Sequence, residues 1–115
     1  MTTSWDGIYA AYMSGSEGQG FAMFVFKDGV ITGSDPMGVA FNGHYSCNES
    51  SDLDGEVSVD IPPNGTVIQG LSTGPTGFQY VVPISFAAAD LEKAYVTLET
   101  PLGGINLKLE KLRGF

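Results

Sequence analysis

The pattern of apolar and polar residues predicts a chain of short β-strands separated by turns. Alternation with a period of two, in which one face of a strand is buried and the other meets water, is clearest in residues 56–61, 94–100 and 104–112. In residues 78–86 the large apolar side chains share one face and Pro83 lies on the other, which favours an edge strand, a bulge or a bend. Further runs rich in aromatic and β-branched residues predict strands at 8–13, 21–26, 30–35 and 39–46.

The turns between the first three predicted strands indicate an antiparallel meander. Asp28-Gly29 separates two apolar pairs, and this dipeptide readily supplies the positive φ angles of a two-residue type I′ turn. The connection at residues 14–20 contains three glycines, each of which costs about 1 kcal/mol in a helix interior. A helix there is therefore disfavoured, and residues 8–26 are expected to form a long β-hairpin.

Several segments leave alternatives open. Asn42-Gly43 is expected to bend or bulge the strand that contains it, and residues 48–55 are expected to form a polar surface loop. Residues 66–71 fit either one turn of helix or a short strand, and residues 87–93 fit one helical turn.

Together these patterns predict a single all-β domain over residues 1–115, because about eight short strands with Gly and Pro between them leave no helix of useful length. Short connections favour an antiparallel up-and-down arrangement, and eight strands of this kind can close into a barrel. The interior of such a barrel is filled by side chains or holds one small ligand. Residues 21–26 are apolar on both faces, so the outer face is expected to meet a second chain or a covering loop.

The composition restricts the kinds of partner. Thirteen Asp and Glu residues against five Lys and Arg give a net charge of −8, and no basic residue lies between Lys27 and Lys93. Such a chain lacks the means to neutralise a nucleic-acid backbone or an anionic membrane, so a basic protein is the expected partner. Only 16% of residues are charged while 43% are hydrophobic, which predicts exposed apolar surface and favours a homodimer.

The sequence also predicts the compartment. The first residues lack the basic and apolar regions of a signal peptide, no run is long enough for a membrane helix, and the single Cys47 cannot form an internal disulfide. A reduced protein in the cytoplasm is expected.

Residues suited to catalysis are scarce. His44 and Cys47 are three positions apart, which places them on opposite faces of a strand and excludes a Cys-His pair if the strand extends that far. No zinc constellation, nucleophile elbow or dinucleotide fingerprint occurs. The expectation is a non-enzymatic protein with no catalytic residue, metal or cofactor.

Two groups of residues remain as candidates for binding. The acidic group of Glu49, Asp52, Asp54 and Glu56 fits a solvated loop, a docking surface for a basic protein or a calcium loop, although the spacing of a calcium loop is missing. The second group consists of aromatic residues that would line a barrel interior and contact an apolar ligand: Phe78, Tyr80 and Phe86.

Residues 6–9, Gly20 before an apolar strand, residues 27–35 and residues 43–45 together resemble the GrlR family of negative regulators of type III secretion. The resemblance covers about the first 45 residues and continues afterwards as a similar rhythm of strands. It implies a lipocalin-like eight-stranded barrel, often dimeric, that represses by holding a DNA-binding transcriptional activator. An acidic run after the fourth strand is implicated in that contact, and residues 48–54 occupy its position here.

The expected function is therefore a regulatory module that sequesters a DNA-binding activator through its acidic loop. The alternative is a barrel that binds a small, lipid-like apolar ligand.

Overall fold

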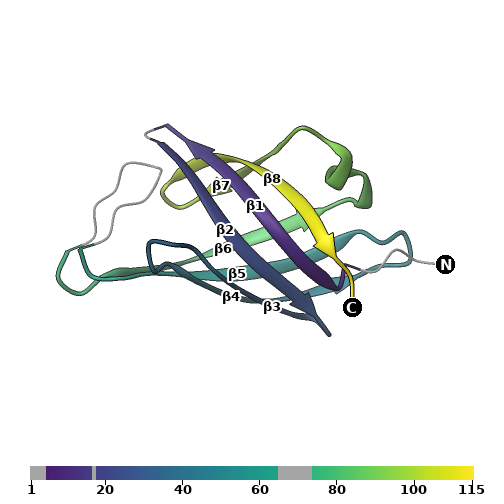
Figure 1. Ribbon diagram of the computed structural model, residues 1–115, viewed down its shortest axis with the longest axis horizontal. Helices are drawn as coiled ribbons and strands as arrows, with labels where there is room; N and C mark the ends of the chain where they lie inside the picture. Colours follow the sequence, from purple (N-terminus) through teal and green to yellow (C-terminus); the bar gives the residue numbers. More distant parts are fainter. Residues whose placement is uncertain (1–4, 17, 65–73) are drawn as a thin grey trace.

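A single antiparallel sheet curls on itself in the computed structural model, which describes residues 5–16, 18–64 and 74–115 (Figure 1). Strands β1, β2 and β8 run diagonally across β3–β6, so that the two parts of the sheet face each other. The strands are β1 (Gly7–Gly15), β2 (Gly18–Lys27), β3 (Val30–Ser34), β4 (Ala40–Cys47), β5 (Leu53–Ile61), β6 (Phe78–Phe86), β7 (Val96–Thr100) and β8 (Gly103–Arg113). A short 3₁₀ helix, η1 (Ala88–Glu92), precedes β7.

The sheet has the order β6-β5-β4-β3-β2-β1-β8-β7, and all seven ladders between neighbours are antiparallel. Strands that follow one another in sequence are neighbours in the sheet, except for β6 and β7, which lie at its two ends. The first strand, β1, also pairs with the last, β8. The edge strands β6 and β7 contact each other, so the barrel is nearly closed. The predicted all-β, up-and-down, eight-stranded barrel is confirmed.

The hairpin between β2 and β3 has the predicted turn. Asp28 and Gly29 have φ angles of 51° and 81°, and Lys27 pairs with Val30 across the turn. Positive φ at both central residues defines the type I′ class, whose twist matches that of the strands.

The first hairpin is longer than predicted. Its ladder continues from Gly7 paired with Phe26 to Gly15 paired with Gly18, so most of the connection expected at residues 14–20 belongs to the strands. The three glycines of this segment disfavour a helix, but they are compatible with the ends of paired strands. The predicted strands therefore ended too early.

The loop expected at residues 48–55 is also shorter, because β5 begins at Leu53. Leu53 is completely buried and pairs with Cys47 on one side and Phe86 on the other. Asp54 and Gly55 therefore lie within the strand, where Asp54 faces outward. The acidic residues of this stretch are therefore divided between the loop, which carries Glu49 and Asp52, and the exposed face of β5, which carries Asp54.

No bulge interrupts β4 at Asn42-Gly43, because its ladders with β3 and β5 run without a shift in register. A Cβ atom at Gly43 would lie 2.2 Å from the backbone oxygen of Glu56 on β5. Gly43 is therefore explained by the close approach of the β4 and β5 backbones and not by a bulge, which is the other common reason for a glycine within a strand. The shift in register that does occur lies between Ile8 and Tyr9, in the ladder of β1 with β8.

The remaining predictions concern β6 and its neighbours. β6 is an edge strand, as Pro83 indicated, and η1 supplies the helical turn expected within residues 87–93. The segment 66–71 lies outside the described residues.

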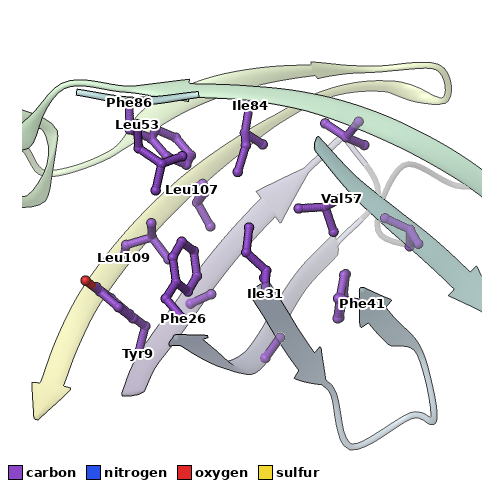
Figure 2. Packing of buried hydrophobic residues seen from close by; sticks show 14 of the residues in the cluster. Tyr9, Phe26, Ile31, Phe41, Leu53, Val57, Ile84, Phe86, Leu107 and Leu109 are labelled. Carbon is purple, nitrogen blue, oxygen red and sulfur yellow. The ribbon is translucent and has the colours of Figure 1, made fainter. Parts of the chain in front are cut away.

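Buried side chains from all parts of the sheet meet inside the barrel (Figure 2). At one end, here called the closed end, Trp5 and Tyr9 pack with Phe26 and Phe86. Trp5 is 2% exposed although it precedes the first strand. The opposite end, here called the open end, carries the β1–β2 turn, the β3–β4 connection and the β7–β8 turn.

Candidate functional site

A cavity of about 500 Å³ occupies the barrel between these two ends. Apolar side chains from all eight strands dominate its wall. In Figure 2, side chains from strands on opposite sides of the barrel point toward one another. The described residues that line it away from the open end are Met13, Phe24, Phe26, Ile31, Val39, Phe41, Val57, Val59, Tyr80, Val82, Ile84, Phe86, Leu98, Ile105, Leu107 and Leu109.

Phe26 and Phe86 form the floor of this cavity at the closed end, and Trp5 and Tyr9 pack behind them. The ring centroids of Trp5 and Phe86 are 6.1 Å apart, and those of Tyr9 and Phe26 are 4.9 Å apart. The Tyr9 hydroxyl donates a hydrogen bond of 2.7 Å to the backbone oxygen of Trp5. Burial, with a smaller contribution from the nearby Asp6 carboxylate, raises the pKa of Tyr9 well above its usual range. The Tyr9 hydroxyl therefore stays protonated well above neutral pH.

The mouth of the cavity lies at the open end. It is lined by Gly18 to Phe21 at the start of β2, Asp35 to Met37 after β3, and Thr100 at the end of β7. Asp35 shapes this rim, because its Oδ1 accepts hydrogen bonds of 2.9 Å from the backbone N–H groups of both Met37 and Val39. The β3–β4 connection is thus held in a defined conformation beside the opening.

The three aromatic residues predicted to line the interior have different surroundings. Tyr80 and Phe86 line the cavity, and Phe86 is 4% exposed. Phe78 lies at the first position of β6 with 42% of its surface exposed, and it is not among the lining residues. The side-chain alternation was predicted correctly, but Phe78 lies too near the end of the strand to reach the interior.

The acidic group lies toward the opposite, closed end. Glu49 and Asp52 belong to the β4–β5 loop, while Asp54 and Glu56 occupy the outward face of β5. Asp52 is half-buried and the other three are exposed. Within the described part of the chain, no ion pair involves these four carboxylates. These four residues, hereafter the acidic face, lie on the outside of the barrel, toward the end opposite to the mouth of the cavity.

The loop that carries Glu49 and Asp52 has a defined conformation. The Asn48 side-chain oxygen accepts hydrogen bonds from the backbone N–H groups of Ser50, at 2.8 Å, and Asp52, at 3.0 Å. Ser51 adopts a φ of 64°, and its backbone oxygen accepts a 2.7 Å hydrogen bond from Nε1 of Trp5. The acidic face is therefore anchored to the floor of the cavity.

His44 and Cys47 both lie on β4, which extends far enough to place them on opposite faces, as the spacing predicted. Both side chains are exposed. Burial of the sulfur, with a smaller contribution from Asp6, raises the pKa of the Cys47 thiol. The neighbouring Tyr45 donates its hydroxyl hydrogen to Asp6 Oδ1, and burial together with this bond raises the pKa of Tyr45.

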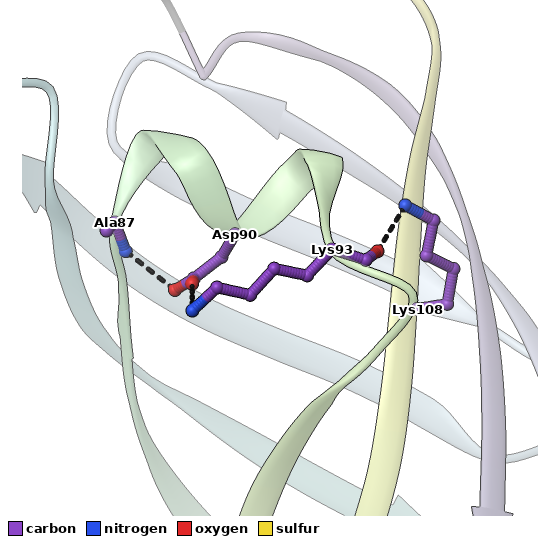
Figure 3. Close-up of polar contacts among 4 residues, drawn as sticks. All are labelled: Ala87, Asp90, Lys93 and Lys108. Atoms are coloured by element: carbon purple, nitrogen blue, oxygen red, sulfur yellow. Dashed lines mark hydrogen bonds and ion pairs between the residues drawn. The ribbon is translucent and has the colours of Figure 1, made fainter.

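Polar contacts at the closed end also fix η1 against β8 (Figure 3). Asp90 Oδ2 accepts a hydrogen bond from the Ala87 N–H, and its Oδ1 lies 2.7 Å from Lys93 Nζ. Lys108 Nζ donates to the backbone oxygens of Lys93, at 2.7 Å, and Leu91, at 3.0 Å. The hydrogen bond from Lys93 lowers the pKa of the Asp90 carboxyl group.

Sequence reasoning missed the residues of the mouth and the role of Trp5. Pro36 and Met37 lie between two predicted strands, and only the curvature of the sheet brings this segment beside Gly18 and Thr100. Nothing near Trp5 in the sequence indicated its hydrogen bond to a loop 46 residues away.

Across residues 5–16, 18–64 and 74–115, no group of three or more His, Cys, Asp and Glu residues has the arrangement of a metal site. The same residues include no helix with the length and apolarity required to cross a membrane.

Comparison with known proteins gives no family: no family model matches the sequence, and no curated protein matches it significantly.

Proposed function

We propose that this barrel binds a small apolar molecule in its interior. The observation that carries the proposal is the cavity of about 500 Å³, which has an apolar wall, with Phe26 and Phe86 at its floor, and a mouth at the open end. Its size falls within the range of about 300–1,000 Å³ that is typical of small-molecule sites. Apolar walls with few polar groups are also typical of such sites.

The expected driving force is the transfer of apolar surface from water. Each buried CH₂ group contributes about 0.8 kcal/mol, so a chain of about ten carbons would gain roughly 8 kcal/mol before the losses of freedom on binding. Because nearly all wall residues belong to strands, the cavity is formed without a ligand and little ordering opposes binding.

A neutral fluorescent probe tests this proposal directly. N-phenyl-1-naphthylamine is expected to bind with saturable enhancement of its emission. Val82→Phe places extra volume in the cavity wall and should weaken binding at least about tenfold, because Val82 is 5% exposed and lines the cavity. Val81→Phe is the matched control, since Val81 is the adjacent residue of β6 and is 48% exposed on the outer face.

Equal binding by the two variants would contradict the proposal, provided that both retain the melting temperature of the wild type within a few degrees. Native mass spectrometry of protein purified from cells gives a second measurement. A species heavier than the chain by one small molecule supports the proposal, whereas apo protein that also fails to take up the probe overturns it.

We further propose that the acidic face binds a basic protein. Three exposed carboxylates, Glu49, Asp54 and Glu56, lie on one ordered surface without a described cationic partner. Such a surface attracts a partner of opposite charge and increases its rate of association. The resemblance to GrlR-type regulators suggests a DNA-binding transcriptional activator as the partner, held in the cytoplasm away from its promoter.

Charge reversal tests this second proposal. Asp52→Lys with Asp54→Lys should abolish recovery of a basic partner in a pull-down at low salt, and raising the salt should reduce recovery by the wild type. Glu99→Lys with Glu110→Lys changes the net charge equally on other exposed strand faces and serves as the control. If the partner is still recovered with the Asp52/Asp54 variant, or is lost equally with the Glu99/Glu110 control, the acidic face is not its binding site.

A homodimer is the third proposal, and it concerns the outer face of β1 and β2. Tyr12, Phe21 and Met23 are 49%, 38% and 37% exposed there, and the rings of Tyr12 and Phe21 are 5.4 Å apart. A second copy of the chain would cover this apolar surface, which the sequence pattern of β2 already indicated.

A further inference from the structure

We infer that the cavity selects molecules whose polar head is uncharged or positively charged, and that it rejects anions such as fatty-acid carboxylates. This inference rests on the proposed binding of an apolar ligand and specifies its chemical class. It follows from where the charged side chains lie relative to the cavity.

All five basic side chains belong to described residues, and none of them lines the cavity. Lys93 and Lys108 are engaged with Asp90 and with backbone oxygens around η1, outside the barrel (Figure 3). Lys27 Nζ lies 4.5 Å from the ring centroid of Phe115. These contacts hold three of the five cations away from the ligand.

The other two basic residues lie at the closed end of the barrel. Lys111 Nζ is 6.0 Å from the ring centroid of Tyr9, which packs behind Phe26 and is not among the residues that line the cavity. Arg113 is the last residue of β8 and is exposed. The single histidine, His44, is exposed on β4 and is also absent from the cavity wall. A carboxylate inside the barrel would therefore meet no cationic side chain.

The segments that the structure leaves undescribed add no basic side chain. Residues 65–73 read Gly-Thr-Val-Ile-Gln-Gly-Leu-Ser-Thr, residues 1–4 read Met-Thr-Thr-Ser, and position 17 is Glu. None of these side chains is basic. The absence of a basic side chain at the cavity consequently holds for the whole sequence.

The mouth is acidic as well. Asp35 is the one charged residue among those that line the cavity in the described chain. Asp60 and Glu99 are the next-to-last residues of β5 and β7, so both lie at the open end. With a net charge of −8 on the whole chain, the potential at the mouth is expected to be negative.

These placements decide which head groups fit. Burying a carboxylate without a partner is strongly unfavourable, and leaving it at the rim brings it toward Asp35. A hydroxyl or an ammonium group avoids both penalties, because each can donate a hydrogen bond to a carboxylate. Bonds from Met37 and Val39 occupy Asp35 Oδ1 and keep this carboxylate beside the opening.

Three ligands with the same chain but different heads provide the test. Dodecylamine, dodecan-1-ol and dodecanoic acid are titrated at pH 7.4 against protein loaded with N-phenyl-1-naphthylamine. The amine and the alcohol are expected to displace the probe at concentrations at least about tenfold lower than the acid. Displacement by the acid at an equal or lower concentration overturns the inference while leaving the proposed function intact.

Two other outcomes also have a definite meaning. If the probe binds and none of the three displaces it, the inferred ligand class is wrong. If the wild type does not bind the probe at all, the proposed function fails first and the inference fails with it.

A gain of function gives an independent measurement. Met37 lines the mouth and is 77% exposed, so Met37→Lys adds a cation at the rim without disturbing the core. This variant should bind dodecanoic acid at least about fivefold more tightly than the wild type and dodecylamine less tightly. Ser50→Lys introduces the same charge in the exposed β4–β5 loop at the closed end and should change neither affinity. Equal effects of the two variants would show that net charge alone, and not the mouth, determines selectivity.

Discussion

Trp5 Nε1 donates a 2.7 Å hydrogen bond to the backbone oxygen of Ser51, which joins the residues before β1 to the loop between β4 and β5. Both residues are buried, and the Trp5 ring also lies 6.1 Å from that of Phe86. One side chain thereby packs against Phe86 at the floor of the cavity and holds the loop that carries Glu49 and Asp52.

Removing the indole N–H should destabilise the fold while keeping an aromatic ring in place. Trp5→Phe removes this buried hydrogen bond, and a hydrogen bond of this kind contributes about 0.5–1.5 kcal/mol to stability. Denaturant unfolding followed by circular dichroism measures the loss. Tyr95→Phe changes an aromatic side chain that is 58% exposed and should shift the free energy of unfolding by less than about 0.5 kcal/mol. Equal stability of the two variants would contradict the role assigned to Trp5.

A methyl group should not be tolerated where the β4 and β5 backbones approach each other. In Gly43→Ala the new Cβ would lie 2.2 Å from the backbone oxygen of Glu56, and relieving this overlap should destabilise the protein by about 1–3 kcal/mol or more. Gly18→Ala is the control, because nothing lies within 4 Å of a Cβ there. Thermal melting compares them, and a Gly43→Ala protein as stable as Gly18→Ala would show that the two strands can separate freely.

The protein should lose stability at alkaline pH. Burial, followed by the influence of Asp6, raises the folded-state pKa of Tyr9 and Tyr45 above the ordinary value of 10.0. The stability that these neutral hydroxyls contribute is fully present below pH 10 and is lost as the pH rises above it, since the unfolded chain releases its protons first. Melting temperatures between pH 8 and 11.5 should therefore fall most steeply beyond pH 10.

The variant Tyr45→Phe isolates one contribution to this alkaline loss. Its melting temperature should depend less on pH above 10 than that of the wild type, whereas the exposed Tyr95→Phe should follow the wild type. A pH dependence that is unchanged in Tyr45→Phe would assign the alkaline loss to other groups.

A charge on the outer face of β2 should dissociate the proposed homodimer. Phe21→Lys introduces a cation beside Tyr12 in the middle of the apolar surface, and like charges from the two copies would then face each other or lie buried without a partner. Light scattering after size exclusion should report a dimer for the wild type and a monomer for Phe21→Lys. Val81→Lys, at a 48% exposed position of β6, should remain dimeric. A wild type that is monomeric at all accessible concentrations would contradict the proposal.

Local patterns were sufficient to predict the class of fold and the neighbours of most strands. Asp28-Gly29 fixed a turn through the φ angles that it prefers, and Val57, Val59 and Ile61 identified the buried face of β5. These signals need only residues that are close in sequence, because turn type and side-chain alternation are set by the local backbone.

Features that depend on residues far apart in sequence were not predictable in this way. Asp54 and Gly55 resemble loop residues, yet Leu53 begins a strand because Cys47 and Phe86 flank it in the sheet. The cavity and its mouth depend on how strongly the sheet curls, which no local pattern specifies. Two parts of the candidate sites could still be proposed in advance: the acidic residues, since exposed charge needs no tertiary partner, and Tyr80 and Phe86, whose alternation along β6 directs them inward.

The ladder between β1 and β8 has a consequence for how the barrel assembles. All other ladders join strands that follow one another along the chain, whereas β1 and β8 are separated by most of the sequence. Contacts of such long sequence separation require closure of a large loop and slow the folding reaction. The hairpins of this protein can form rapidly on their own, so the union of the first and last strands is the step expected to limit the rate of folding.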